Sequence, residues 1–73
     1  MEEEFALKLG LKPLGRILSY ADAEVEPIDF SIAPSKAIPI ALERAGKKLN
    51  DIDYFEINEA FAATVLANIK VIL

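Results

Sequence analysis

The chain has 73 residues, of which 53% are hydrophobic, and a formal net charge of −4. This length allows one small core at most, and so apolar a composition excludes an intrinsically disordered chain. A domain of this size buries only about 60% of its unfolded surface, so we expect some apolar residues to face another chain or another part of the same protein. The basic residues form no patch. Nucleic acid is therefore not expected as a partner.

Neither cysteine nor histidine occurs in the sequence. Disulfides and thiolate chemistry are therefore excluded for this chain, and we expect no metal site, because the carboxylates show no ligand spacing. No apolar run approaches the ~20 residues that a membrane span requires. The acidic start after Met1 is also unlike a signal peptide. We therefore expect a soluble, intracellular chain that does not interact with membranes.

The first half of the sequence predicts a helix, a strand, a loop and a second helix. Residues 2–9 have the apolar spacing of a helix that Gly10 closes. Residues 16–23 have apolar side chains on both faces, which is typical of a strand covered on both sides. Residues 24–33 predict an irregular loop. A helix then begins near Pro34, and its apolar face consists of Ala37, Ile38, Ala41, Leu42 and Ala45, with Gly46 after it.

The second half predicts another strand and another helix. Pro39 lies inside the preceding helix and removes a backbone hydrogen bond, which should kink the helix or move its start later, so we expect an irregular first turn. Residues 54–57 predict a short strand. The last helix has an apolar stripe that consists of Phe61, Val65, Ile69 and Ile72, with Leu66 and Leu73 beside it. Strands that alternate with helices indicate the α/β class, although two strands make a poor sheet alone.

Three residues lie where a ligand could bind. Asn58 lies at the predicted turn between the second strand and the last helix, where an asparagine most often caps the helix. The alternative is an amide held at a strand end that donates to a bound water or to an oxyanion. Phe30 and Ile32 lie on the loop, and they either plug the edge of the core or form a pocket wall.

Several motifs, in the same order, resemble the thiolase family. Residues 58–61, Asn-Glu-Ala-Phe, resemble the NEAF motif of thiolases together with the apolar segment before them. Residues 13–21 and 41–46 resemble the same family. Residues 25–34 look most like the acetoacetyl-CoA thiolases of the mitochondrial type. The resemblance runs from about residue 5 to residue 73, which corresponds to a minor part of a thiolase.

The resemblance implies a partial thiolase-like αβαβα layered fold, with residues 1–73 spanning the junction of the N-terminal and C-terminal halves. It implies part of an acetyl-CoA C-acetyltransferase, which condenses two acetyl-CoA molecules into acetoacetyl-CoA or cleaves the product. Coenzyme A thioesters are then the substrates, no cofactor is bound covalently, the full-length enzyme is a homo-oligomer, and the location is mitochondrial or cytoplasmic. The family's two catalytic cysteines and its GHP-motif histidine have no counterpart here, so we expect this chain alone to be inactive.

The same resemblance gives roles to individual residues. Asn58 matches the asparagine that holds a water and, with the histidine, stabilises the oxyanion of the thioester enolate. Phe61 matches an aromatic residue of the acyl pocket, and Phe30 matches a pocket residue of enzymes that also accept 2-methyl-branched acetoacetyl-CoA. Ser31 and Pro39 depart from the family pattern. The alternative is a non-catalytic thiolase-like chain that acts as an interaction or assembly module through its apolar surfaces.

Overall fold

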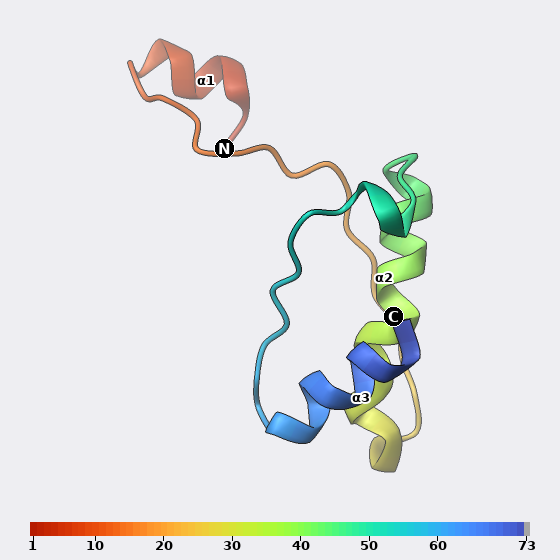
Figure 1. The fold of residues 1–73 in the computed structure, drawn as a ribbon. Coiled ribbons are helices and arrows are strands. Elements are labelled where there is room, and N and C mark those ends of the chain that lie inside the picture. Colours follow the sequence, from red (N-terminus) through yellow and green to blue (C-terminus); the bar gives the residue numbers. More distant parts are fainter. Residues whose placement is uncertain (73) are drawn as a thin grey trace.

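The computed structural model describes residues 1–72, and the regular elements in that part of the chain are all helical. In chain order they are α1 (Glu3–Lys8), the 3₁₀ helix η1 (Pro27–Ile32), α2 (Ala33–Arg44), the 3₁₀ helix η2 (Leu49–Asp51) and α3 (Ala62–Ile72). Figure 1 shows α1 standing apart at one end, while α2 and α3 lie together at the other. Leu73, which the sequence places beside the apolar stripe, lies outside the described residues.

Glycines end the first two α-helices with the same backbone arrangement. Gly10 follows α1 with a φ of 72°, and Gly46 follows α2 with a φ of 64°. The residue after each glycine donates its N–H to a carbonyl in the last turn of the helix, at 2.9 Å in both cases: Leu11 to Ala6, and Lys47 to Leu42. This is the Schellman motif, which satisfies carbonyls that a helix end leaves unpaired. The predicted glycine stops are confirmed.

Helix α2 keeps the apolar face that the sequence predicts, since Ala37, Ile38, Ala41, Leu42 and Ala45 are all partly buried. Pro39 lies on its exposed side and does not interrupt it. The predicted later start of this helix is therefore wrong, because the proline removes only one backbone hydrogen bond. The irregular turn comes earlier in the chain, as η1, which runs directly into Ala33.

Neither predicted strand forms among residues 1–72. The first segment, 16–23, runs along α2: Ser19 Oγ donates to the Ala41 carbonyl at 2.6 Å, and the Arg44 guanidinium donates to the Tyr20 carbonyl at 2.7 Å. The second segment reaches α3 by a separate path (Figure 1). A strand exists only when another strand pairs with its backbone, and these two segments do not pair with each other. The predicted alternation of strands and helices is therefore not seen in the described chain.

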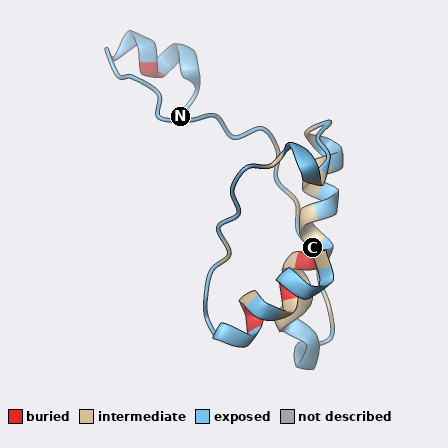
Figure 2. Cartoon of the chain, viewed as in Figure 1, coloured by how far each residue is buried: buried red, intermediate tan, exposed pale blue. Residues whose placement is uncertain are grey.

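The buried core is small and largely polar. The buried side chains of residues 1–72 are Ala6, Ser35, Thr64 and Asn68 (Figure 2). The accessible surface is 6501 Å², whereas a compact protein of 8.0 kDa exposes about 4,450 Å². The radius of gyration is 15.3 Å, against about 11 Å for a compact chain of this length. The apolar excess that the composition predicts therefore lies on the surface.

Helix α3 packs on the rest of the chain through a polar face. Thr64 and Asn68, four residues apart, are buried where α3 meets η1. Ile69 of the predicted apolar stripe is exposed, and so is Leu66 beside it. This part of the helix surface is therefore available to surfaces outside the described residues, whereas Val65 and Ile72 of the stripe are partly buried.

The caps give a direct stability prediction. We expect Gly46→Ala to lower the free energy of unfolding by about 1–2 kcal/mol, because alanine disfavours the left-handed conformation. Gly15→Ala is the matched control, since Gly15 has no positive φ and an added Cβ meets nothing within 4 Å. Urea unfolding followed by far-ultraviolet circular dichroism measures both variants. Equal unfolding midpoints would contradict a left-handed cap at Gly46.

Candidate functional site

Asn58 lies exposed in the irregular segment that leads to α3. The helix begins at Ala62, and in its first turn the Thr64 N–H donates to the Phe61 carbonyl at 3.0 Å. Asn58 is therefore three residues before the capping position, too early for its side chain to accept from the first turn. The predicted helix-cap role of Asn58 is wrong, because the helix starts later than the sequence indicates.

A cavity of about 460 Å³ opens beside Asn58. Residues 21–23 form one wall, residues 56–58 form another, and the first turns of α2 form the third through Ala33, Pro34, Ala37 and Ile38. The α2 wall is apolar, whereas Asp22 and Glu56 contribute charged groups. No hydrogen bond of the Asn58 amide is found within residues 1–72. The amide therefore lies on a cavity of a size that suits a small ligand, with its donors not committed to the described chain.

Phe30 and Phe61, which are far apart in the sequence, are in contact in the structure. Their ring centroids are 6.1 Å apart with an interplanar angle of 68°, which is an edge-to-face pair. Phe30 comes from η1 and is 50% exposed, while Phe61 directly precedes α3 and is 62% exposed. The pair therefore offers open ring surface to an apolar group. Neither ring is among the described residues that line the cavity beside Asn58.

Asn68 has a structural position that the sequence analysis missed. Its side chain is 0% exposed, and Nδ2 donates to the carbonyls of Ser31 and Thr64, both at 2.7 Å. Only the amide nitrogen can donate to two carbonyls, so these partners fix its orientation. Asn68 Oδ1 and Thr64 Oγ1 are buried without a partner among residues 1–72. The sequence does contain a sign of this buried pair. Thr64 and Asn68 are the two uncharged polar residues of α3, and their spacing of four positions puts them on one face of the helix.

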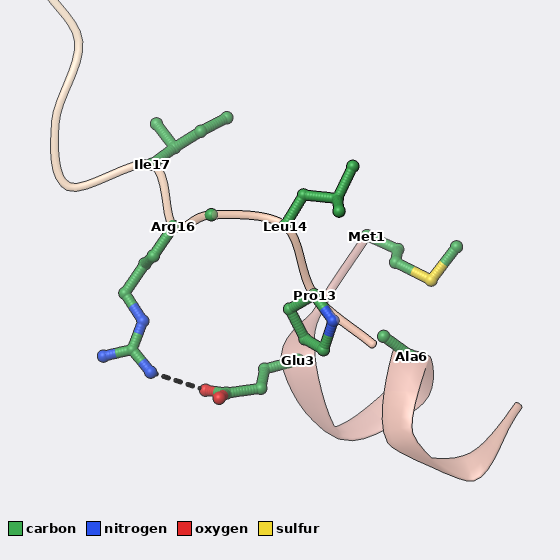
Figure 3. A pocket seen from close by; sticks show the side chains of 8 residues that line it. Met1, Glu3, Ala6, Pro13, Leu14, Arg16 and Ile17 are labelled. Atoms are coloured by element: carbon green, nitrogen blue, oxygen red, sulfur yellow. Dashed lines mark hydrogen bonds and ion pairs between the residues drawn. The ribbon is translucent and has the colours of Figure 1, made fainter. Parts of the chain in front are cut away.

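A second concavity, of about 600 Å³, lies between α1 and the connector that follows it (Figure 3). Arg16 and Glu3 form an ion pair at 2.7 Å across one side of it. Both side chains are more than half exposed, so this pair adds little to stability. The remaining lining is largely apolar, and it includes none of Asn58, Phe30 and Phe61.

Residues 1–72 contain neither a candidate metal cluster nor a candidate membrane span. No group of three or more histidine, cysteine, aspartate or glutamate side chains is placed to hold a metal ion in that range. Nor does any helix there have the length and apolar character to cross a membrane. The candidate site therefore consists of Asn58 with its cavity and of the Phe30–Phe61 pair.

Residues 11–72 match the family model of the thiolase C-terminal domain. The chain belongs to the thiolase family. Over 72 residues it is 57% identical to a probable acetyl-CoA acetyltransferase of Dictyostelium discoideum, an alignment that covers 99% of this chain and 17% of that protein. It is 53% identical over 72 residues to the mitochondrial acetyl-CoA acetyltransferase of Bos taurus, with the same coverage of each chain. The thiolase chain described here thus spans about a sixth of these relatives.

Solved structures agree with this family assignment. The backbone superimposes on the crystal structure of the Bacillus anthracis acetyl-CoA acetyltransferase with a TM-score of 0.87 at 48% identity, over 96% of this chain and 18% of that one. The Syntrophomonas wolfei acetyl-CoA acetyltransferase gives a TM-score of 0.85 at 38% identity, over 97% of this chain and 18% of that one. The expected likeness to the thiolase fold is confirmed, whereas the two-strand alternation within this chain is not.

The aromatic contact gives a second prediction. In a double-mutant cycle, Phe30→Leu and Phe61→Leu are expected to show a coupling of about 0.5–1.5 kcal/mol in the free energy of unfolding, because each ring loses its edge-to-face partner. Tyr54→Leu combined with Phe61→Leu is the matched control, since Tyr54 is an exposed aromatic residue that forms no ring pair with Phe61. Urea unfolding of the single and double variants measures the coupling. Additive effects for Phe30 and Phe61 would rule the contact out.

Proposed function

We propose that this chain supplies the oxyanion-binding asparagine and part of the acyl pocket of an acetyl-CoA C-acetyltransferase. The reaction condenses two acetyl-CoA molecules into acetoacetyl-CoA, or cleaves acetoacetyl-CoA by thiolysis, and its substrates are coenzyme A thioesters. One observation carries the proposal: residues 58–61 have the NEAF sequence inside a 62-residue match to the thiolase C-terminal domain model. The names of the relatives from Dictyostelium discoideum and Bos taurus support the same activity.

The role of Asn58 follows from the charge that the reaction creates. When a thioester loses a proton from its α-carbon, negative charge develops on the thioester oxygen. An amide that donates to that oxygen, directly or through a water that it holds, stabilises the oxyanion. The exposure of Asn58 and the cavity of about 460 Å³ beside it support this role.

Phe30 and Phe61 form the apolar part of the proposed site. Their edge-to-face contact leaves ring surface exposed. An acyl chain that covers this surface removes apolar area from water, which favours binding. A phenylalanine at position 30 matches enzymes that accept a methyl branch at carbon 2 of acetoacetyl-CoA. We therefore propose that the pair contacts the acyl group and not the adenine end of coenzyme A.

The catalytic nucleophile and the acid–base groups come from outside these 73 residues. The sequence has no cysteine and no histidine. We also propose that segments 16–23 and 54–57 pair as strands with neighbours elsewhere in the complete αβαβα fold. We propose that residues 1–73 span the junction between its N-terminal and C-terminal halves.

The names of the relatives support the proposed location. Mitochondrial acetyl-CoA acetyltransferases of Bos taurus and Mus musculus are each 53% identical to this chain over 72 residues. We propose a mitochondrial location, with the cytoplasm as the alternative, and a homo-oligomer for the complete enzyme. The surface of 6501 Å² favours a second candidate function, in which the chain is a non-catalytic module that associates through exposed apolar side chains.

The proposed role of Asn58 can be tested in a segment-swapped enzyme. We define this as the Dictyostelium relative with its matching 72-residue segment replaced by this chain. Asn58→Ala is expected to lower kcat for acetoacetyl-CoA thiolysis about 10²–10³-fold with little change in KM, because the lost donor acts on the transition state. Asn50→Ala, at an exposed amide in η2, is the control and should leave both constants unchanged. Unchanged turnover in Asn58→Ala would remove Asn58 from the mechanism.

The isolated 73-residue chain separates the two candidate functions. We expect no thiolysis from it, and an average mass in sedimentation that rises with concentration, because its apolar side chains are uncovered. The matched variant carries Leu66→Lys and Ile69→Lys on the exposed face of α3, and it should associate less. A compact monomer at all concentrations would contradict the expected association, and turnover by the isolated chain would contradict the need for residues outside it.

A further inference from the structure

One buried amide links the two backbone segments that carry the phenylalanine rings. The Ser31 carbonyl, which accepts from Asn68 Nδ2 at 2.7 Å, directly follows Phe30 in η1. The Thr64 carbonyl accepts from the same nitrogen at 2.7 Å, and the Thr64 N–H donates to the Phe61 carbonyl at 3.0 Å. Asn68 is thus bonded to the residue next to Phe30 on one side, and it is two hydrogen bonds away from Phe61, through Thr64, on the other.

The η1 side of this link depends on contacts from outside the element. A 3₁₀ helix of six residues has poor hydrogen-bond geometry and fixes its own position weakly. The Phe30 carbonyl is bonded by the Ala33 N–H, and the next carbonyl, that of Ser31, is bonded by Asn68. Because Asn68 is 0% exposed, solvent does not compete for these bonds. The amide therefore determines where the end of η1 lies relative to α3.

We infer that Asn68 is a positioning residue that sets the acyl selectivity of this site. By holding the Ser31 and Thr64 carbonyls on one nitrogen, it fixes the separation of the Phe30 and Phe61 rings, whose centroids are 6.1 Å apart. The separation of these two rings then decides how closely they contact a methyl branch on the acyl group. This inference rests on the proposed function, in which the two rings contact the acyl chain.

Two substitutions break the link in different ways. Asn68→Asp keeps the shape of the side chain, but a carboxylate has no donor for the two carbonyls and repels them. Asn68→Ser leaves a hydroxyl that reaches only its own helix, so the bond to Ser31 is lost without a buried charge. Thr64→Val is the matched control, because it removes a buried hydroxyl that has no partner among residues 1–72 and leaves the backbone carbonyl in place.

The test is the substrate preference of the segment-swapped enzyme. The ratio of kcat/KM for 2-methylacetoacetyl-CoA to kcat/KM for acetoacetyl-CoA does not depend on the fraction of enzyme that is folded, so a merely structural role would not move it. We expect this ratio to fall on the order of tenfold in Asn68→Asp and Asn68→Ser, since one methyl group in an apolar pocket is discriminated by that amount. Thr64→Val should leave the ratio unchanged. In a Phe30→Leu background, Asn68→Ser should cause no further change.

The remaining outcomes are distinguishable. An unchanged ratio in folded Asn68→Ser enzyme would overturn the positioning role. Failure of both Asn68 variants to fold would also overturn it, because the amide would then be needed for the fold and not for selectivity. If the unsubstituted segment-swapped enzyme turns over neither substrate, the proposed function has failed and the inference falls with it.

Discussion

The buried Asn68 amide joins the end of η1 to α3 at the place where the chain buries its polar side chains. Its nitrogen donates to the Ser31 carbonyl of η1 and to the Thr64 carbonyl of its own helix, both at 2.7 Å. A buried amide that loses its partners costs about 1–3 kcal/mol, which is large beside what so small a core contributes. The edge-to-face contact of Phe30 and Phe61 depends on the same arrangement. Stability and the proposed acyl pocket therefore share one side chain.

The apolar surface is the second constraint on this molecule. Its 73 residues expose 6501 Å², and large side chains of α1, of the connector after it and of α3 lie in solvent. Hydrophobic side chains that a small chain cannot bury are stabilised only when another surface covers them. The backbone nevertheless follows solved acetyl-CoA acetyltransferases closely, with TM-scores of 0.87 and 0.85. Its local hydrogen bonds and glycine caps are thus compatible with the arrangement that those larger enzymes adopt.

The sequence predicts those features that depend on local physics. The helix ends at Gly10 and Gly46 follow from left-handed caps, and the apolar face of α2 follows from its periodicity. The irregular backbone of segments 16–23 and 54–57 could not be predicted from their local pattern, because strand pairing needs neighbours that lie far away in sequence or outside the chain. The position of Asn68 was missed because periodicity weights apolar residues and passes over a polar pair. The motif at residues 58–61 identified the candidate asparagine, yet no local rule places it on the cavity against α2.

The most direct measurement is acetoacetyl-CoA thiolysis by the unsubstituted segment-swapped enzyme, compared with its Dictyostelium parent. This chain contributes 72 aligned residues at 57% identity, and everything else in the protein is held constant. If these residues supply a working oxyanion donor and part of the acyl pocket, the swapped enzyme cleaves acetoacetyl-CoA at a rate comparable to that of the parent. A folded swapped enzyme with the parent's oligomeric state but without turnover would contradict the proposed function.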